Sequence, residues 1–200
     1  MIRQKPFIVE LTGTPEAGKT TIINLLHKKL SDLGYKVKVY PESAEESKQV
    51  FPRDPNCTSD SKLWMNVLTL KHLIEAPYQD YDIILFDRGA VDRIFWIYLD
   101  LLYNDFSLEK DISLELFFKE YLPDYLIIFK VSIEEALRRR GGEGHIVTKD
   151  FLNDYNRLLN AFINSIRINK SIVCTDNMNI EEVLNVTTNL ILENIKNRPS

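Results

Sequence analysis

The sequence has little cysteine and no long apolar run. Its two cysteines, Cys57 and Cys174, lie far apart and belong to no CxxC pair or Cys/His cluster, which argues against a structural zinc site. No apolar stretch nears the ~20 residues that span a bilayer, and the first residues lack the apolar region of a signal peptide. We therefore expect a cytoplasmic protein with reduced thiols and no membrane partner.

An excess of positive charge is also missing. Lys+Arg 25 and Asp+Glu 29 give a formal net charge of −4. A protein that binds nucleic acid polymers neutralises phosphates with surplus lysine and arginine, so we expect no such partner. The hydrophobic share of 44% suffices for a full core, and 200 residues fit a single domain that spans residues 1–200.

Glycine is scarce and unevenly placed. There are 7 glycines, and all but Gly34 gather at three places. These places hold Gly13 and Gly18, then Gly89, then Gly141, Gly142 and Gly144. A chain so sparing with glycine keeps it where the backbone turns tightly or approaches a ligand closely. The three places are therefore the first candidates for a functional site.

Apolar periodicity predicts alternating strands and helices. Short apolar runs, typical of buried strands, occur at residues 7–12, 37–40, 82–87, 125–131 and 172–175. Apolar residues recur at helical spacing over residues 22–33, 63–76, 91–103, 111–121, 133–140, 151–166 and 180–195. Residues 41–60 are polar and contain proline, so we expect a long loop there. This order predicts an α/β fold, a five-stranded parallel sheet with helices on both faces, whose ligands bind beyond the carboxyl ends of the strands.

The clearest motif follows the first strand. Residues 13–20 read Gly-Thr-Pro-Glu-Ala-Gly-Lys-Thr, which fits the phosphate-loop pattern G-x-x-x-x-G-K-[ST]. Backbone N–H groups of such a loop wrap phosphates, Lys19 can reach the β and γ oxygens, and Thr20 can hold Mg²⁺. The predicted ATP-binding residues are Gly13, Thr14, Pro15, Glu16, Ala17, Gly18, Lys19, Thr20 and Thr21. A plain strand–turn–helix connection is the alternative, and the complete motif between a predicted strand and a helical stripe argues against it.

A carboxylate and an arginine end the third strand. Asp87 is placed to hold Mg²⁺ together with Thr20, and the Arg88 guanidinium can clamp a phosphate with two hydrogen bonds. A solvated Asp-Arg turn is the alternative. The phosphate loop earlier in the chain favours the functional interpretation.

Three arginines precede the last glycine cluster. Arg138, Arg139 and Arg140 fan widely around a helix, so at least one of them faces a nearby phosphate site. The glycines that follow suit a hinge and predict a lid at about residues 138–150, with Arg138 and Arg140 as its contacts to ATP. A basic helix end that complements the helix dipole is the alternative.

Together these residues resemble the P-loop kinases, and within them the thymidylate kinase and deoxynucleoside kinase group. The resemblance rests on residues 13–20, 87–89 and 138–144. It implies a phosphate loop after a central first strand, with ATP and Mg²⁺ as cofactors. It also implies transfer of the γ-phosphate to a nucleoside, nucleoside monophosphate or similar small metabolite. Gly89 departs from the serine of the deoxynucleoside kinase pattern.

The resemblance also assigns roles. The implied catalytic residues are Lys19, Glu42, Asp87, Arg88 and Arg138. In deoxynucleoside kinases a glutamate at the place of Glu42 removes the proton of a sugar hydroxyl, whereas a monophosphate acceptor needs Arg88, and the sequence leaves both open. The lid supplies the catalytic arginine, because Glu16 occupies the loop position that carries it in some thymidylate kinases. Asp92 with Arg93 fits either a base-reading residue or a surface Asp-Arg step.

Two other function classes stay open. A GTPase or ATPase switch shares the phosphate loop, but the nearest candidate for a guanine-reading motif, residues 169–172, lacks its aspartate. Intact Lys19, Thr20 and Asp87 argue against a nucleotide-binding regulatory protein without catalysis. A possible homodimer would use the apolar helices at residues 63–76 and 91–103.

Overall fold

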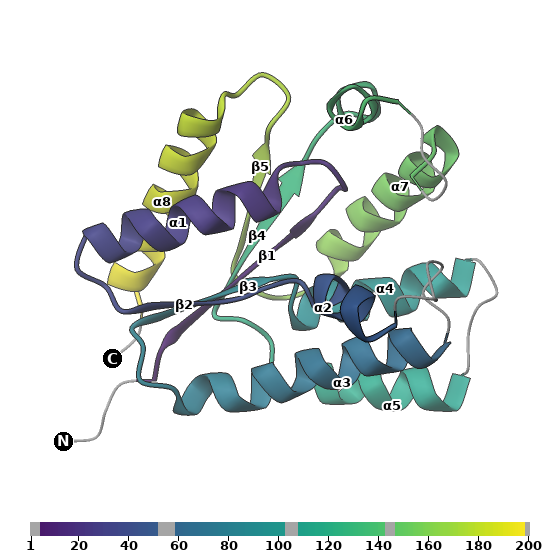
Figure 1. The fold of residues 1–200 in the computed structure, drawn as a ribbon, viewed down its shortest axis with the longest axis horizontal. Coiled ribbons are helices and arrows are strands. Elements are labelled where there is room, and N and C mark those ends of the chain that lie inside the picture. Colours follow the sequence, from purple (N-terminus) through teal and green to yellow (C-terminus); the bar gives the residue numbers. More distant parts are fainter. Residues whose placement is uncertain (1–4, 52–58, 103–107, 143–146, 199–200) are drawn as a thin grey trace.

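The fold is built on a five-stranded parallel sheet (Figure 1). The computed structural model describes residues 5–51, 59–102, 108–142 and 147–198. The strands are β1 (Phe7–Gly13), β2 (Val37–Tyr40), β3 (Ile83–Asp87), β4 (Tyr125–Lys130) and β5 (Lys170–Cys174), in the order β2-β3-β1-β4-β5. The central position of β1 and the parallel pairing confirm the predicted fold class.

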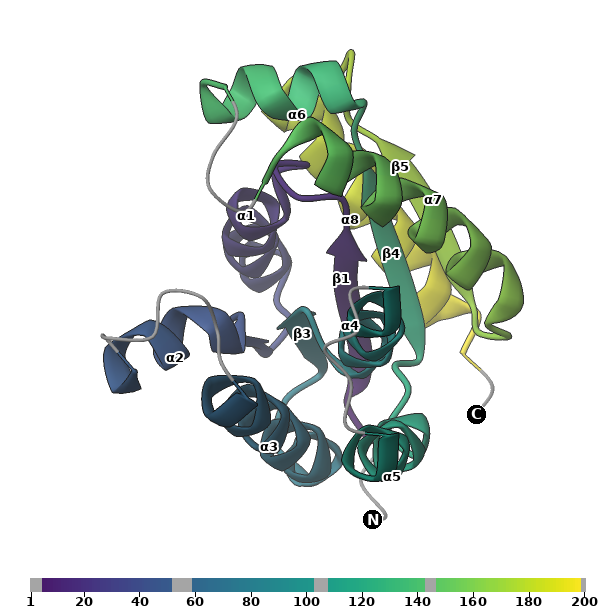
Figure 2. The same ribbon diagram turned by 90° about the vertical axis from the view of Figure 1, so that its right-hand side faces the viewer.

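Helices cover both faces of the sheet (Figure 2). They are α1 (Lys19–Asp32), α2 (Ser43–Val50), α3 (Ser59–Glu75), α4 (Ala90–Leu102), α5 (Leu108–Lys119), α6 (Ile133–Arg140), α7 (Lys149–Ser165) and α8 (Ile180–Lys196), with a 3-10 turn, η1, at Ala76–Tyr78. Apolar residues of α1 and α8 pack on one face, and those of α4 and α7 pack on the other. α3 and α5 lie beside α4.

The central strand sends its side chains into two different environments. Val9 and Leu11 belong to the wholly apolar core under α1 and α8. Glu10 and Thr12 face the opposite way and bond to α4. Both sets are buried, so one face of β1 is apolar and the other carries polar groups that need partners.

The loop predicted over residues 41–60 is wrong for much of its length. α2 occupies Ser43–Val50, and α3 begins at Ser59. α2 buries Ser43 and Ser47, and the Thr69 hydroxyl of α3 donates to Ser43 Oγ at 3.1 Å. Because the packing face of α2 is small and polar, no apolar stripe marks this helix in the sequence. The other elements agree with the prediction to within a few residues.

The segment predicted as a lid, residues 138–150, joins α6 to α7. Gly141 adopts φ 84° and ends α6, and the Thr148 hydroxyl begins α7 by accepting from Phe151 N at 3.1 Å. Residues 143–146, which include Gly144, lie outside the described residues, as does Cys57. Closure of this segment stays a prediction.

The helices named for a homodimer differ in how they are covered. α3 exposes Leu63, Val67 and Ile74, whereas most apolar side chains described for α4 lie in the core. The homodimer stays a prediction. Among the described helices none is both long and apolar enough to cross a membrane.

Candidate active site

The phosphate loop connects β1 to α1 at the carboxyl edge of the sheet. Gly13 adopts φ 127°, and a Cβ there would lie 2.0 Å from the Phe129 carbonyl oxygen of β4. Thr14 N donates to the same oxygen at 2.9 Å, which presses the loop against β4. Gly18, with φ 87°, precedes α1, and no described side chain caps the N–H groups of the first turn. Such a helix start is suited to bind an anion.

Lys19 is the buried cation of the loop. Its Nζ donates to the carbonyl oxygens of Gly13 at 3.0 Å and Thr14 at 2.7 Å. Burial, together with the nearby Arg88 charge, lowers the pKa of Lys19 to about 7. A phosphate in the loop would supply an anionic partner and raise that pKa again.

Thr20 and Asp87 form the candidate metal site. The Thr20 hydroxyl donates to Asp87 Oδ2 at 2.7 Å, which joins α1 to the end of β3. Burial raises the pKa of Asp87, and its buried Oδ1 has no hydrogen-bond partner among the described residues. A carboxylate oxygen without a partner, beside a hydroxyl, fits the oxygen ligands of Mg²⁺. Across the described ranges no three His, Cys, Asp or Glu side chains gather to hold a metal, so the ion would need nucleotide phosphates as further ligands.

Arg88 and Glu42 form an ion pair at the ends of two neighbouring strands. Glu42 follows β2 and Arg88 follows β3, and Arg88 Nε lies 2.8 Å from Glu42 Oε1. Arg88 adopts a left-handed φ of 65°, and its N–H donates to the Leu11 carbonyl at 3.1 Å. This conformation is unfavourable for a residue with a side chain, so the surrounding bonds must hold it in place.

Asp92 and Arg93 are buried, so the interpretation as a surface step is wrong. Their exposed fractions are 0% and 6%. Asp92 Oδ1 accepts from the Thr12 hydroxyl at 2.7 Å and from Arg88 at 2.8 Å, and Oδ2 accepts from Arg93 at 3.1 Å. Burial alone would raise the pKa of Asp92, but the two guanidinium groups hold it below its usual value. Asp92 therefore stays ionised and fixes Arg88 from the side of α4.

Arg138 and Arg139 both donate to Glu135 of their own helix, but the three arginines at the end of α6 differ in their contacts with the phosphate loop. Arg138 is exposed and donates twice, at 2.6 Å, to Glu135 of its own helix. Arg139 donates to the Glu16 carbonyl of the phosphate loop at 3.2 Å, and Arg140 lies 3.3 Å from the Glu16 carboxylate. The structure thus places Arg139 and Arg140 against the loop and leaves Arg138 on its own helix.

One family model matches the part of the chain that carries the phosphate loop. The model of the family described as AAA domain matches residues 8–128, which run from β1 into β4 and include the phosphate loop, Asp87 and Arg88. The chain belongs to the AAA domain family. No curated protein matches this AAA-domain chain at a significant level.

Solved structures share the fold of the AAA-domain chain over nearly its whole length. A deoxyadenosine kinase from M. mycoides with the products dCMP and dCDP has a TM-score of 0.67 at 21% identity, covering 94% of this chain and 100% of its own. The same kinase with dATP bound has a TM-score of 0.63 at 20% identity, and the match covers 93% of this chain and 100% of the kinase chain. A thymidylate kinase from Candida albicans has a TM-score of 0.66 at 17% identity, and the match covers 96% of this chain and 94% of the kinase chain. These neighbours confirm the P-loop kinase-like fold that the sequence predicts.

α7 supplies contacts to the phosphate loop that sequence reasoning missed in this AAA-domain chain. The Tyr155 hydroxyl donates to the Gly13 carbonyl at 3.0 Å, and the Thr14 hydroxyl donates to Asn156 Oδ1 at 2.9 Å. Burial raises the pKa of Tyr155. Tyr155 lies within an apolar stripe, where an aromatic is expected to be a core residue. The pattern therefore carries no sign of its polar contact.

Sequence reasoning also missed Thr175, which follows β5, and Glu10 of β1. Arg139 also donates to the Thr175 hydroxyl at 3.0 Å and to its carbonyl at 2.6 Å. Glu10 of β1 is 1% exposed and accepts from the backbone N–H groups of Val91 at 3.0 Å and Asp92 at 2.8 Å. Burial raises the pKa of Glu10 to about 7. An acidic residue inside an apolar strand was the available signal for Glu10.

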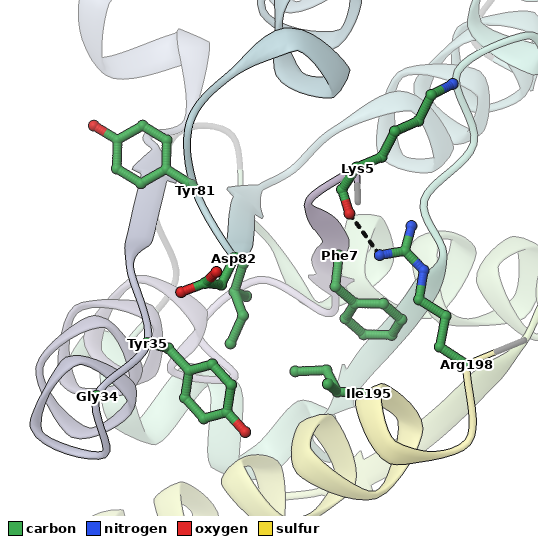
Figure 3. Close-up of a pocket in the computed structure, with 9 residues that line it drawn as sticks. Lys5, Phe7, Gly34, Tyr35, Tyr81, Asp82, Ile195 and Arg198 are labelled. Atoms are coloured by element: carbon green, nitrogen blue, oxygen red, sulfur yellow. Dashed lines mark hydrogen bonds between the residues drawn. The ribbon is translucent and has the colours of Figure 1, made fainter. Parts of the chain in front are cut away.

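A separate pocket lies at the amino end of β1 (Figure 3). It has a volume of about 450 Å³, and Phe7, Tyr35 and Tyr81 contribute its rings. Arg198 donates to the Lys5 carbonyl at 2.7 Å and lies over the Phe7 ring. Because β1 runs away from this pocket toward the phosphate loop, the pocket takes no part in the candidate active site.

Proposed function

We propose that this chain is an ATP-dependent kinase that transfers the γ-phosphate to a hydroxyl group of a nucleoside or similar small metabolite. The observation that carries the proposal is the Glu42–Arg88 ion pair beside the Thr20–Asp87 pair. The Glu42–Arg88 pair suits the acceptor of the transferred phosphoryl group, and the Thr20–Asp87 pair suits a magnesium-bound donor. Both lie at the carboxyl edge of the sheet, where ligands of open α/β sheets bind. The nucleoside and nucleotide kinases that share the fold are consistent with it.

The donor half consists of the phosphate loop and its neighbours. Residues 13–21 would wrap the β- and γ-phosphates of ATP with backbone N–H groups, aided by the start of α1. Lys19 would exchange its two carbonyl partners for phosphate oxygens. Thr20 and Asp87 would hold Mg²⁺, which supplies neutralisation of charge on those oxygens when bound. Arg138, Arg139 and Arg140 are the cations available to close over the phosphates.

The charge balance of the acceptor half favours a hydroxyl over a phosphate. Arg88 already forms ion pairs with two carboxylates, those of Glu42 and Asp92, each at 2.8 Å. A monophosphate carries about −1.5 to −2 charges at pH 7, and it would have to displace Glu42 and leave that carboxylate beside new negative charge. A neutral hydroxyl can donate to Glu42 while the pair with Arg88 persists. A nucleoside monophosphate is therefore the alternative acceptor, not the preferred one.

In this proposal Glu42 acts as the general base. Its carboxylate accepts the proton of the acceptor hydroxyl as the hydroxyl oxygen bonds to the γ-phosphorus. The bond from that phosphorus to the oxygen shared with the β-phosphate breaks, and ADP leaves with the electron pair. Lys19 and Arg88 stabilise the negative charge spread over the transferring group.

The test is transfer from ATP to a panel of nucleosides and nucleoside monophosphates. With a nucleoside acceptor, Glu42→Gln should lower kcat on the order of 10²-fold with a modest change in KM. Glu45→Gln is the matched control, because the Glu45 carboxylate lies on the exposed side of α2 and pairs with Lys48. The control should keep the parent kcat.

Other outcomes would replace the proposal. Transfer only to monophosphates, with Arg88→Ala raising the acceptor KM and Glu42→Gln doing little, would make the acceptor a phosphate. Steady ATP hydrolysis whose rate does not change when any acceptor is added would favour an ATPase switch. Nucleotide binding without turnover would favour a regulatory protein.

A further inference from the structure

A side chain from another element caps the start of α4. α4 begins at Ala90, and the residue before it, Gly89, has no side chain to serve as an N-cap. An N-cap side chain usually accepts from the backbone N–H of the second or third helical residue. Here these are Val91 and Asp92, and Glu10 Oε2 and Oε1 accept from their N–H groups at 3.0 and 2.8 Å. The Glu10 carboxylate of β1 therefore accepts the hydrogen bonds that an N-cap side chain would otherwise accept.

Gly89 is needed for space and not for backbone conformation. It is not among the glycines with positive φ. A Cβ at this position would lie 2.8 Å from Glu10 Oε2 and 3.0 Å from Glu10 Cδ. The Glu10 carboxylate thus fills the volume that an N-cap side chain at position 89 would occupy. Glu10 and Gly89 are two parts of one arrangement.

The first turn of α4 in turn fixes the acceptor half of the site. Asp92 in this turn bonds to the Arg88 guanidinium and accepts from the Thr12 hydroxyl. Thr12 and Glu10 lie on the same face of β1, so the central strand holds this turn at two points. Loss of Glu10 would leave two buried N–H groups unsatisfied and loosen the turn that carries Asp92.

We propose that Glu10 is a positioning residue of this site, which sets the place of Asp92 and through it that of Arg88 by capping α4 from β1. The inference rests on the proposed function, because it assigns Glu10 to the acceptor half. It also gives a reason for Gly89 where the deoxynucleoside kinase pattern carries a serine: a Cβ at this position would lie 2.8 Å from Glu10 Oε2, so a serine there requires Glu10 to shift.

An exchange of the cap tests the inference. Glu10→Ala should lower kcat on the order of 10-fold or more, because a small displacement of the aligned groups is costly, and should leave the KM for ATP little changed. Gly89→Ser should also lower kcat, since its side chain meets Glu10. The double variant Glu10→Ala/Gly89→Ser places a serine N-cap in the vacated space and should exceed both single variants in kcat.

A destabilising control separates positioning from general loss of structure. Val9→Ala removes buried volume from the opposite face of β1, where Val9 is 0% exposed and packs in the core under α1 and α8. This variant should lower the unfolding temperature and keep the parent kcat. If Glu10→Ala does not fold, Glu10→Gln takes its place, because its amide nitrogen must face one of the two N–H groups.

A spectroscopic measurement decides the inference without turnover. The NMR signal of the Arg88 guanidinium group, assigned by its absence in Arg88→Lys, reports the ion pairs with Asp92 and Glu42, each at 2.8 Å. It should broaden or vanish in Glu10→Ala and return in the double variant. An unchanged signal in Glu10→Ala, or a double variant whose kcat does not exceed that of both single variants, overturns the inference. If the parent protein phosphorylates no acceptor, the proposed function fails, and the Arg88 signal alone decides the role of Glu10.

Discussion

Replacing Glu10 by glutamine should change how the stability of this protein depends on pH. Burial raises the pKa of Glu10 from 4.5 to about 7, although the N–H groups of Asp92 and Val91 act in the opposite direction. The folded protein therefore binds more protons than the unfolded chain between these two values. The contribution to stability is fully present below the unfolded pKa and is lost as pH rises through the folded pKa.

The size of the effect follows from the same two values. A rise from 4.5 to about 7 corresponds to about 3 kcal/mol of unfolding free energy. Glutamine does not titrate, so the free energy of unfolding of Glu10→Gln minus that of the parent should increase by about 3 kcal/mol between pH 4 and pH 8. Any hydrogen bond that the variant loses shifts this difference at all pH values and leaves its slope unchanged.

Urea unfolding of both proteins at a series of pH values measures this difference. Glu115→Gln is the control of opposite sign. Partial burial raises the pKa of Glu115, but hydrogen bonds from Lys119 and Tyr98 bring it below the usual value. The stability that this carboxylate contributes is therefore lost as pH falls. If the free energies of unfolding of Glu10→Gln and the parent change with pH in parallel, the reasoning that burial raises the pKa of Glu10 is refuted.

Three further changes probe the donor half. Lys19→Ala should cut turnover on the order of 10²-fold in a steady-state assay, whereas the exposed Lys28→Ala control should not; near-normal turnover of Lys19→Ala would remove the phosphate-loop interpretation. Asp87→Asn should lose most activity at low Mg²⁺ and regain part of it at high Mg²⁺, and a loss independent of the metal would make Asp87 a base or a structural residue. Arg139→Ala should raise the KM for ATP more than Arg138→Ala, because Arg139 bonds to the loop; equal effects would contradict the arrangement of the arginines.

The sequence predicts the strands well because their signal is local. The three inner strands, β1, β3 and β4, are short and mostly apolar runs, and the phosphate loop is a contiguous motif with a strand before it. The sequence does not predict α2, because this helix packs through Ser43 and Ser47 and small polar residues give no amphipathic pattern. The periodicity of a chain reports a helix only when the helix buries apolar residues.

The site was predicted in part for a similar reason. Arg88 could be named because it follows the carboxylate at a strand end, and Glu42 because of the resemblance to deoxynucleoside kinases; the sheet order then places their side chains 2.8 Å apart. Tyr155 could not, because its hydroxyl reaches Gly13 across 142 positions of sequence. Which arginine of α6 reaches the loop depends on tertiary contacts, such as those of Arg139 with the carbonyls of Glu16 and Thr175. Such choices depend on tertiary contacts that no local pattern contains.

The alternation along β1 also separates where this protein can be re-engineered from where it cannot. Val9 and Leu11 pack in the apolar core beneath α1 and α8, so a library of volume-conserving substitutions confined to that core should yield variants of higher melting temperature with unaltered turnover. The residues that alternate with them, Glu10 and Thr12, each hold the first turn of α4. Robustness and specificity could then be evolved independently, on opposite sides of a single strand.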